Sequence, residues 1–410
     1  MKILFVNTLY TPYNIGGAEK SVQLLAEGLV RGGDQVTVVT LHEHAAEQED
    51  ELNGVRIVRL PLDNIYWPYG GADVAHSLPQ RLQWHFRNSF NRKAARRFAP
   101  VLEAERPDVV HMHITTGFSV ALWREVKRRG IPLVQTLRDY SVMCTRASLF
   151  KNGSNCEQRC LECRILTVPG KRESAQVDQL VSNSDFVISA HHAHGYFPGV
   201  PARRVFNIVP LQNKPRDRRE AEVPLTFGFI GRIEAEKGID VVLEATTRLD
   251  RDDWRLRIAG VGVPEYVREL KERYADPRIE WVGFTKADDF YRSIDTVLIA
   301  SVWREPLPRT LIESLSYGLS AICADSGGIP EIADLARYAI TYPATDAAAL
   351  SAAMRTAVDN KPEWRGGGLR TPDALEWFAE QRIVSENRAA YVDAIAGQAA
   401  HYSGGEQSPA

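Results

Sequence analysis

The chain has 410 residues, a length too great for one ordinary hydrophobic core and natural for two domains. Its hydrophobic content of 44% and charged content of 25% are those of a globular protein, and a net charge of −2 gives no global field that would attract nucleic acid. No apolar run approaches the ~20 residues of a membrane span, and the N-terminal MKILFVNTLY lacks a cationic leader and a small-residue cleavage site, so we expect a cytoplasmic protein.

Short β-type runs alternate with amphipathic helical runs along the first half of the chain. The pattern from Ala18 to Val30, for example, keeps its apolar residues on one helical face. Strands that alternate with helices indicate a parallel, doubly wound sheet. The runs that we predict as strands are residues 2–7, 35–40, 55–60, 108–113, 132–137, 185–190 and 204–209.

The polar segment 213–224, with two prolines and mixed charges, predicts a linker, after which the alternation restarts. The class predicted is therefore α/β, with one Rossmann-like domain over residues 1–212 and a second over residues 223–371. Ligands bind such sheets at the carboxyl ends of the strands, so we expect the site in a cleft between the domains. The second set of predicted strands covers residues 225–231, 255–260, 279–284, 296–301 and 320–325.

The end of the chain contains one more helical pattern. We predict a helix over residues 372–396 that packs back across the joint between the domains. The remaining residues, 397–410, are expected to form a disordered tail.

The segment FGFIGRIEAEKGIDVVLEA, residues 227–245, has the sharpest local pattern in the chain. An apolar strand ends at Gly231, a loop with Arg232 and Lys237 follows, and a helix is predicted from about Gly238. A helix N-terminus offers free N–H groups and the positive end of its dipole, so two cations beside it predict a seat for a diphosphate. The alternative is a surface loop with ordinary solvated charges.

The first predicted strand is followed by a comparable turn. Gly16 and Gly17 precede a helix predicted from Ala18, so the backbone there can approach a ligand closely. A flexible turn without a ligand is the alternative.

Two glutamates, Glu305 and Glu313, lie in the mostly apolar stretch SVWREPLPRTLIESLSY, residues 301–317. Pro306 and Pro308 prevent a helix before Arg309, which places Glu305 in a loop and Glu313 in the helix that follows. The plain alternatives are an ion pair of Glu305 with a neighbouring arginine and a solvated helix-surface charge at Glu313.

Four motifs together resemble a known family. GGAE at 16–19, GRxxxxKG at 231–238, E-x7-E at 305–313 and GGIPE at 327–331 are similar, in order and spacing, to those of retaining glycosyltransferases of family 4. The resemblance covers roughly residues 1–340 and implies the GT-B fold, in which two Rossmann-like domains face each other across a cleft. It also implies a nucleotide-diphosphate sugar as donor, UDP- or GDP-linked, and a glycan or polyprenyl-linked acceptor.

The resemblance implies roles for single residues. Glu305 would hydrogen-bond hydroxyl groups of the donor sugar, and Glu313 would hold the ribose hydroxyls, a task that suits ionised carboxylates. Arg232 and Lys237 would neutralise the departing nucleoside diphosphate, which makes Arg232, Lys237 and Glu305 the predicted catalytic residues. The other predicted donor-binding residues are Gly16, Gly17, Phe284 beside the base, and Leu307, Pro308, Arg309 and Thr310 around the diphosphate.

The implied transfer requires no metal, since the cationic loop replaces it. Retention is expected by front-face attack, with the leaving phosphate taking the acceptor proton, so no protein nucleophile is assigned. The one DxD-like string, DRDD at 250–253, is interpreted as a solvated turn.

The chain departs from the family pattern in QTLRDY, residues 135–140, where related enzymes commonly carry a histidine before the aspartate. Arg138 stands there, and because arginine is permanently charged it cannot serve as an acid–base group. It could bind donor phosphate or an anionic acceptor, or signal reduced activity. We place His113, Arg138 and Asp139 on the acceptor or sugar side, with a satisfied core histidine as the alternative for His113.

Four of the five cysteines lie within residues 144–163, in a segment predicted as an insertion at about 141–170. Four thiolates are the ligand set of a structural zinc site, although the spacing is irregular for a zinc ribbon. Reduced thiols without a metal are the alternative. The predicted ligands are Cys144, Cys156, Cys160 and Cys163.

Residues 79–98 hold six basic residues, no acid and four interleaved aromatics. A basic helix with aromatics fits an anionic membrane surface, which would place the protein at the inner face of the plasma membrane near a lipid-linked acceptor. The same pattern would fit RNA, but the near-neutral chain and the absence of an RNA-binding motif argue against nucleic acid. The alternative is an amphipathic helix with aromatics in the core.

The sequence thus favours a retaining, nucleotide-sugar-dependent glycosyltransferase of polysaccharide or glycoconjugate assembly. Two alternatives remain: a GT-B epimerase or phosphorylase, and a catalytically weak sugar- or lipid-binding subunit that works with a partner. Arg138 is the feature that favours the last.

Overall fold

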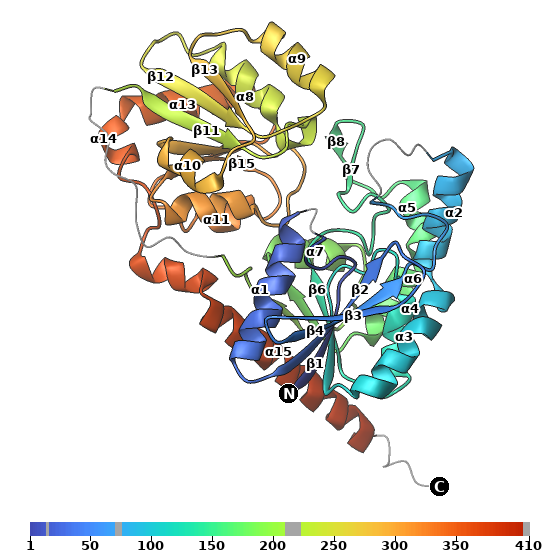
Figure 1. Cartoon of the computed structure of the whole chain (residues 1–410). Helices are drawn as coiled ribbons and strands as arrows, with labels where there is room; N and C mark the ends of the chain where they lie inside the picture. The colour runs from blue at the N-terminus through green and yellow to red at the C-terminus, as the bar shows by residue number, and fades with distance from the viewer. Residues whose placement is uncertain (14–15, 70–75, 210–222, 405–410) are drawn as a thin grey trace. The chain divides into compact units, whose positions relative to one another are not determined.

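The computed structural model describes residues 1–13, 16–69, 76–209 and 223–404, which form two compact units (Figure 1). The first unit contains Met1–Ser148, Glu157–Ile208 and the chain from Glu380 onward. The second contains Leu149–Cys156 and Val209–Ala379. Each unit is built on its own mostly parallel sheet with helices between strands, which confirms the predicted α/β, doubly wound class. The linker predicted at 213–224 and the end of the predicted first domain lie almost wholly outside the described residues.

The first unit has an eight-stranded sheet in the order β10-β9-β6-β5-β1-β2-β4-β3. Its strands run parallel except β3, an exposed edge strand that pairs antiparallel with β4. The strand order changes direction between β1 and β5, and such a switch point is where open α/β sheets bind ligands. The strands are β1 (Lys2–Val6), β2 (Gln35–His42), β3 (Gln48–Leu52), β4 (Val55–Pro61), β5 (Val109–Met112), β6 (Leu133–Leu137), β9 (Gln179–Ser182) and β10 (Ala202–Arg204).

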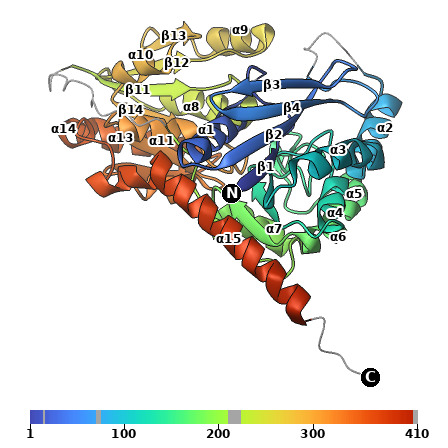
Figure 2. The ribbon, with the colours of Figure 1, turned by 60° about the horizontal axis from the view of Figure 1, so that its bottom comes forward.

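Helices connect these strands, and the C-terminal helix α15 completes the unit. It packs against α1 and against β5, β6 and β9, and Figure 2 shows the helix along its length. Its Tyr391 hydroxyl lies 2.8 Å from Nδ1 of His111 on β5, so a buried hydrogen bond ties the end of the chain to this sheet. The helices are α1 (Gly17–Arg31), α2 (Leu78–Ser89), α3 (Arg92–Glu105), α4 (Ala121–Lys127), α5 (Leu161–Leu166), α6 (Val168–Glu173), η1 (Ser174–Gln176), α7 (Asp185–Ala193) and α15 (Glu380–Gly404).

The second unit has a six-stranded parallel sheet in the order β13-β12-β11-β14-β15-β16, with its switch point between β11 and β14. Both central strands are buried along nearly their whole length, so the first residues able to reach a ligand are those that follow their carboxyl ends. The strands are β11 (Leu225–Ile230), β12 (Trp254–Ala259), β13 (Ile279–Gly283), β14 (Thr296–Ile299), β15 (Ser320–Asp325) and β16 (Ala339–Pro343).

The helices of the second unit lie between these strands, and a small hairpin belongs to the same unit. The hairpin consists of β7 (Phe150–Lys151) and β8 (Ser154–Asn155). The helices are η2 (Ala235–Lys237), α8 (Ile239–Thr246), α9 (Pro264–Arg273), α10 (Ala287–Arg292), α11 (Arg309–Ser316), α12 (Ile329–Ala333), α13 (Ala347–Asp359), α14 (Lys361–Trp364) and η3 (Pro372–Phe378).

Two strand predictions were wrong. Residues 185–190 form the start of helix α7, because Ser184 caps it by accepting a hydrogen bond from the Val187 N–H, and the true strand β9 lies just upstream. Residues 204–209 do not continue as a strand after Arg204. Strand β10 ends there because its partner β9 ends at Ser182, which pairs with Arg204.

Two helix predictions differ from the structure in their bounds. The basic segment 79–98 forms two helices. Helix α2 ends at Ser89, and Asn91 caps the start of α3 with a side-chain oxygen 3.1 Å from the Ala94 nitrogen. The pattern over 372–396 divides at Ala379, whose backbone is extended, into η3 and α15. Helix α15 continues to Gly404, so residues 397–404 are helical where a disordered tail was expected, and residues 405–410 lie outside the described part.

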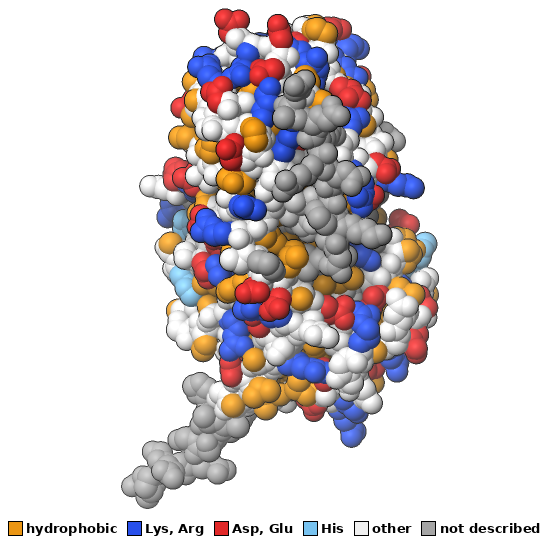
Figure 3. Space-filling view, turned by 90° about the vertical axis from the view of Figure 1, so that its left-hand side faces the viewer, with side chains coloured by type: hydrophobic (Ala, Val, Ile, Leu, Met, Phe, Trp, Pro, Cys, Tyr) orange, Lys and Arg blue, Asp and Glu red, His pale blue; other side chains and the backbone are white. Residues whose placement is uncertain are grey.

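No described helix is both long enough and apolar enough to cross a membrane. On the molecular face drawn in Figure 3, lysine and arginine side chains are interspersed with aspartate and glutamate. Mixed charge on that face is what the near-zero net charge predicts.

Candidate active site

Lys237 and Glu305 meet at the switch point of the second unit. Lys237 follows β11 and Glu305 follows β14, and Nζ of Lys237 lies 2.9 Å from Oε2 of Glu305. The two side chains are 18% and 15% exposed, so the pair is largely sheltered but still reaches the surface. Sequence analysis assigned both residues to the donor, and the structure brings them together across 68 positions of chain.

Two glycines allow the loops around this pair to approach closely. Gly238 has φ +75°, and a Cβ there would lie 1.8 Å from the Ala300 carbonyl oxygen at the end of β14. Gly327 has φ +63°, and its Cβ would lie 2.2 Å from the Glu305 carbonyl oxygen. Only glycine fits both requirements, so these motif glycines hold the Lys237 and Glu305 loops in place.

Neighbouring groups fix the pair further. The Ser301 hydroxyl donates to Oε2 of Glu305 at 2.5 Å, and Nζ of Lys237 lies 5.4 Å from the centre of the Trp303 ring. Asn155 of the β7–β8 hairpin donates to the Val302 carbonyl at 2.7 Å and accepts from the Arg304 N–H at 3.1 Å. The backbone that carries Glu305 is therefore held on several sides, as a site residue requires.

Arg232 lies in the same loop but is more open. Its guanidinium forms ion pairs with Glu234 at 2.9 Å and Glu236 at 3.3 Å, and its side chain is 61% exposed. Burial, with the charge of Glu234 beside it, raises the pKa of Glu236. An anion that bound Arg232 would have to replace these carboxylates.

Glu313 lies on α11, the helix that follows the Glu305 loop. Its carboxylate accepts hydrogen bonds from Nε of Arg309 at 2.7 Å and from the Tyr291 hydroxyl at 3.1 Å. Burial, together with the charge of Glu313, holds the pKa of Tyr291 well above its usual value. Nη1 of Arg309 is buried without a hydrogen-bond partner in the described chain, which leaves a donor available near the start of the helix.

Five of the remaining predicted donor residues lie in the second unit. Leu307 is buried, Pro308 is the residue before α11, and Arg309 and Thr310 begin it, so this helix N-terminus lies a few residues from Glu305. Phe284 follows the end of β13 and is 87% exposed. An aromatic ring so exposed makes few contacts within the described protein.

The first unit has a separate cavity of about 280 Å³, the volume of roughly nine water molecules. Residues after β1 and after β5 line it, which places it at the switch point of that sheet. Burial raises the pKa of the Asp139 carboxyl and lowers that of the His85 imidazole. The lining side chains that can exchange hydrogen bonds include Asn7, Thr8, Glu19, His85, Asn88, Thr116, Asp139 and Ser141.

Arg138 and Asp139 are adjacent in sequence, but their side chains line different pockets. Asp139 lines the 280 Å³ cavity, whereas the Arg138 guanidinium donates to Oδ1 of Asn207 and lines a small neighbouring pocket. Desolvation lowers the pKa of Arg138 to about 10, so it is charged at neutral pH.

His113 is buried beneath this region, and neither of its ring nitrogens has a hydrogen-bond partner within the described residues. Burial holds its pKa well below the usual value, so it is neutral. Gly16 and Gly17 begin α1, and the Gly16 N–H donates to Glu19 at 3.0 Å.

Two of the four clustered cysteines lie close together in the first unit. Sγ of Cys144 lies 3.8 Å from Sγ of Cys163, and Cys160 is the cap of α5, whereas Cys156 belongs to a segment of the second unit. Within the described chain, no three His, Cys, Asp or Glu side chains are arranged to hold a metal ion. The four-thiolate zinc site stays a prediction from sequence.

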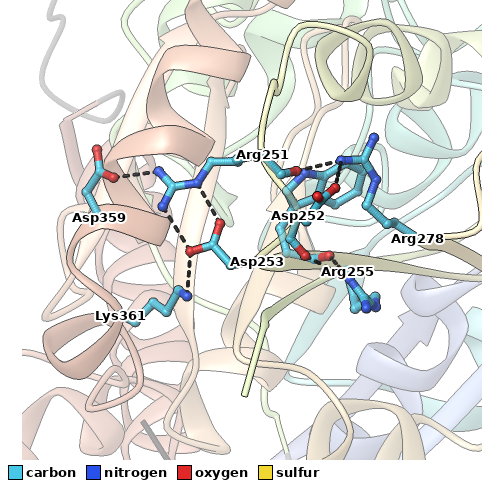
Figure 4. A network of polar contacts seen from close by, with 8 residues as sticks. Arg251, Asp252, Asp253, Arg255, Arg278, Asp359 and Lys361 are labelled. Atoms are coloured by element: carbon cyan, nitrogen blue, oxygen red, sulfur yellow. Dashed lines mark hydrogen bonds and ion pairs between the residues drawn. The ribbon is translucent and has the colours of Figure 1, made fainter. Parts of the chain in front are cut away.

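The DRDD string carries a network of ion pairs (Figure 4). Asp253 accepts from Arg251 at 2.6 Å and from Lys361 at 2.6 Å, and Arg251 also pairs with Asp359 at 2.5 Å. These cations hold the pKa of Asp253 well below its usual range. The string therefore ties the start of β12 to α13 and α14.

Sequence reasoning missed several residues that support Glu305 and Glu313. Ser301 and Trp303 lie within four positions of Glu305, so their closeness in sequence could have indicated them. Tyr291 and Asn155 carry no such signal, because each comes from a distant segment that only folding brings near.

Comparison with known families gives matches to two models that together span most of the chain. The model described as glycosyl transferases group 1 matches residues 212–365, and the glycosyl transferase 4-like domain matches residues 16–207. A Klebsiella pneumoniae protein described as an uncharacterized 42.6 kDa protein in the cps region is 33% identical over 333 residues, which are 81% of this chain and 87% of that protein.

Solved structures share the fold at low sequence identity. Sucrose-phosphate synthase from Thermosynechococcus elongatus has a TM-score of 0.72 at 16% identity, covering 96% of this chain and 99% of that one. Anabaena HepE, solved in complex with UDP, has a TM-score of 0.67 at 14% identity, covering 95% and 99%. These structural similarities show the fold alone, and the match to the Klebsiella pneumoniae protein shows that the two sequences are related.

Proposed function

The chain belongs to the glycosyltransferases of the GT-B type, and on that premise we propose that it moves a sugar, with retention, from a nucleotide-diphosphate sugar to a glycan or polyprenyl-linked acceptor. The observation that carries the proposal is the Lys237–Glu305 pair at the switch point of the second unit. A related protein encoded in a cps region supports a role in polysaccharide or glycoconjugate assembly. We place that role at the inner face of the plasma membrane.

The donor is proposed to bind at the loops after β11 and β14. Lys237 would carry the positive charge toward the diphosphate, with Arg232 reaching the same group once it exchanges its carboxylate partners. Glu313 would hold the ribose hydroxyls, since an ionised carboxylate accepts two such hydrogen bonds. A UDP- or GDP-linked sugar fits this set, and UDP is the nucleotide bound in the HepE structure.

The proposed transfer proceeds in one step and uses no nucleophile from the protein. The bond from the sugar C1 to the diphosphate oxygen breaks, and a bond from C1 to the acceptor hydroxyl forms on the same face. The acceptor proton passes to the leaving phosphate oxygen. Lys237 stabilises the charge that develops on that phosphate, and Glu305 orients the sugar hydroxyls; no metal ion is assigned to the step.

A thermal-shift panel of UDP, GDP, ADP and CDP with their sugar conjugates, each with and without chelator, tests the proposal. We expect one nucleotide series to raise the melting temperature, because a ligand that binds only the native state stabilises it by about 2.7 kcal/mol at a hundredfold excess over Kd. A Glu313→Gln variant should lose most of that shift. If no nucleotide shifts the wild type, the donor assignment is wrong.

A further inference from the structure

Exposed apolar side chains gather on three neighbouring helices of the first unit. Of the thirteen large hydrophobic side chains that are exposed in the described chain, six lie on α2, α5 and α6. We call these six the apolar patch: Leu78 (66% exposed), Leu82 (48%), Phe86 (74%), Leu161 (71%), Ile165 (60%) and Val168 (53%).

The spacing of the apolar patch arranges its side chains in rows on two of the helices. Leu78, Leu82 and Phe86 recur every fourth residue, so they share one face of α2, and Leu161 and Ile165 do the same on α5. The three helices pack against one another, and the Ser89 hydroxyl at the end of α2 donates to the Leu166 carbonyl at the end of α5. Exposed apolar side chains gathered on neighbouring helices mark an interaction site.

The charges beside the apolar patch are positive. Arg81, Arg87, Arg164 and Arg172 are exposed on the same helices, and no ion pair holds any of them within the described residues. The two acidic side chains on these helices are less exposed. Glu162 is half-buried beside Thr145, and Glu173 is buried in an ion pair with Arg124. The face in Figure 3, in contrast, mixes both signs.

The inner side of the same helices lines the 280 Å³ cavity. Trp84, His85 and Asn88 of α2 and Leu166 at the end of α5 all contribute to its wall. One pair of helices therefore separates the cavity from the apolar patch. A molecule held at the patch would be one helix thickness away from the cavity, which is about 10 Å.

We propose that the apolar patch docks this unit on an anionic lipid bilayer, with α2, α5 and α6 in the headgroup region. Interfacial helices combine apolar side chains with unpaired arginines. The apolar side chains insert among the lipid tails, and the arginines bind anionic headgroups. A second copy of the chain would present the same positive charge and be repelled. One part of this inference rests on the proposed function: the 280 Å³ cavity receives the sugar of a lipid-anchored acceptor.

Vesicle cosedimentation of the full chain tests the docking without any nucleotide. We expect the wild type to bind phosphatidylcholine vesicles that contain phosphatidylglycerol far better than phosphatidylcholine alone, and less well in high salt. Arg81→Gln/Arg87→Gln/Arg164→Gln should weaken binding about a hundredfold, at about fivefold for each charge. Phe86→Ser/Ile165→Ser should weaken it at least about tenfold.

Matched variants control for loss of charge or apolar surface as such. Val392→Ser removes a side chain that is 56% exposed on α15, and Arg248→Gln/Arg268→Gln/Arg355→Gln removes three exposed charges of the second unit. Both should bind as the wild type does. Equal loss in the controls, or equal binding to vesicles without phosphatidylglycerol, would overturn the docking proposal.

The two proposals fail independently. Vesicle binding without any nucleotide shift would sustain the docking and contradict the donor site. A nucleotide shift without vesicle binding would do the reverse. If the wild type instead binds an acidic protein and no vesicle, the partner has been assigned to the wrong class.

Discussion

Replacing Lys237 with methionine tests the central pair, because the change removes the cation and keeps most of the side-chain volume. The charge pair at 2.9 Å is largely sheltered, with both side chains less than one-fifth exposed. If Lys237 stabilises the leaving diphosphate, kcat/KM should fall by about 10² to 10³, or roughly 2.7–4 kcal/mol, the cost of removing one group that stabilises developing charge. The assay is release of the nucleoside diphosphate found in the thermal-shift panel.

A structural role for the pair would also lower activity, so a second variant separates the two explanations. Lys237→Met leaves Glu305 without its cation, which we expect to cost about 1–3 kcal/mol of stability even though Ser301 still donates to it. Lys237→Met/Glu305→Gln leaves no unpaired charge and should recover that stability. If the pair serves catalysis, the double variant folds well and stays inactive.

A matched ion pair in the same unit gives the control. Lys361 lies 2.6 Å from Asp253 and is 16% exposed, much like Lys237, but it belongs to the DRDD network. Lys361→Met should lower the melting temperature by a few degrees and leave kcat/KM unchanged. Near-normal activity in Lys237→Met, or activity regained in the double variant, would refute the assignment of Lys237 to the leaving group.

Two further predictions concern single residues. Glu313→Gln should raise KM for the donor about 10- to 100-fold with little change in kcat, because a ribose contact is made equally in ground and transition states; steady-state kinetics in which only kcat fell would contradict this role. His191 is fully buried, and desolvation lowers its pKa to about 4, below the ~6.5 of the unfolded chain. As the pH falls, the unfolded state therefore takes up the proton before the folded state does. The stability that the neutral, buried His191 contributes is fully present above pH 6.5 and is lost as the pH falls toward 4. Denaturant titrations at pH 7 and pH 5 should show this loss as about 2 kcal/mol more in the wild type than in His191→Gln, and equal losses would show that His191 is not the group responsible.

The sequence by itself determined the α/β class and the place of the motifs. The starts of strands β11 and β14 were predicted correctly and their ends to within two residues, since a buried parallel strand is a short apolar run. Motif glycines such as Gly238 and Gly327 could be recognised because their backbone conformation admits few other residues. Lys237 could be singled out as a cation in the loop after β11, whereas the role of Glu305 came from the family resemblance.

Only the tertiary structure decided which side chains meet and which stay exposed. The contact of Glu313 with Tyr291, and the tie from Asn155 to the Glu305 loop, join segments with no common pattern. The same limit explains why residues 185–190 were assigned as a strand, since a six-residue apolar run fits either period. In the basic segment, Trp84 turned inward and Phe86 outward, two positions apart on one helix. Composition gives a side chain its chemistry, but burial depends on what packs against it, and that partner comes from elsewhere in the chain.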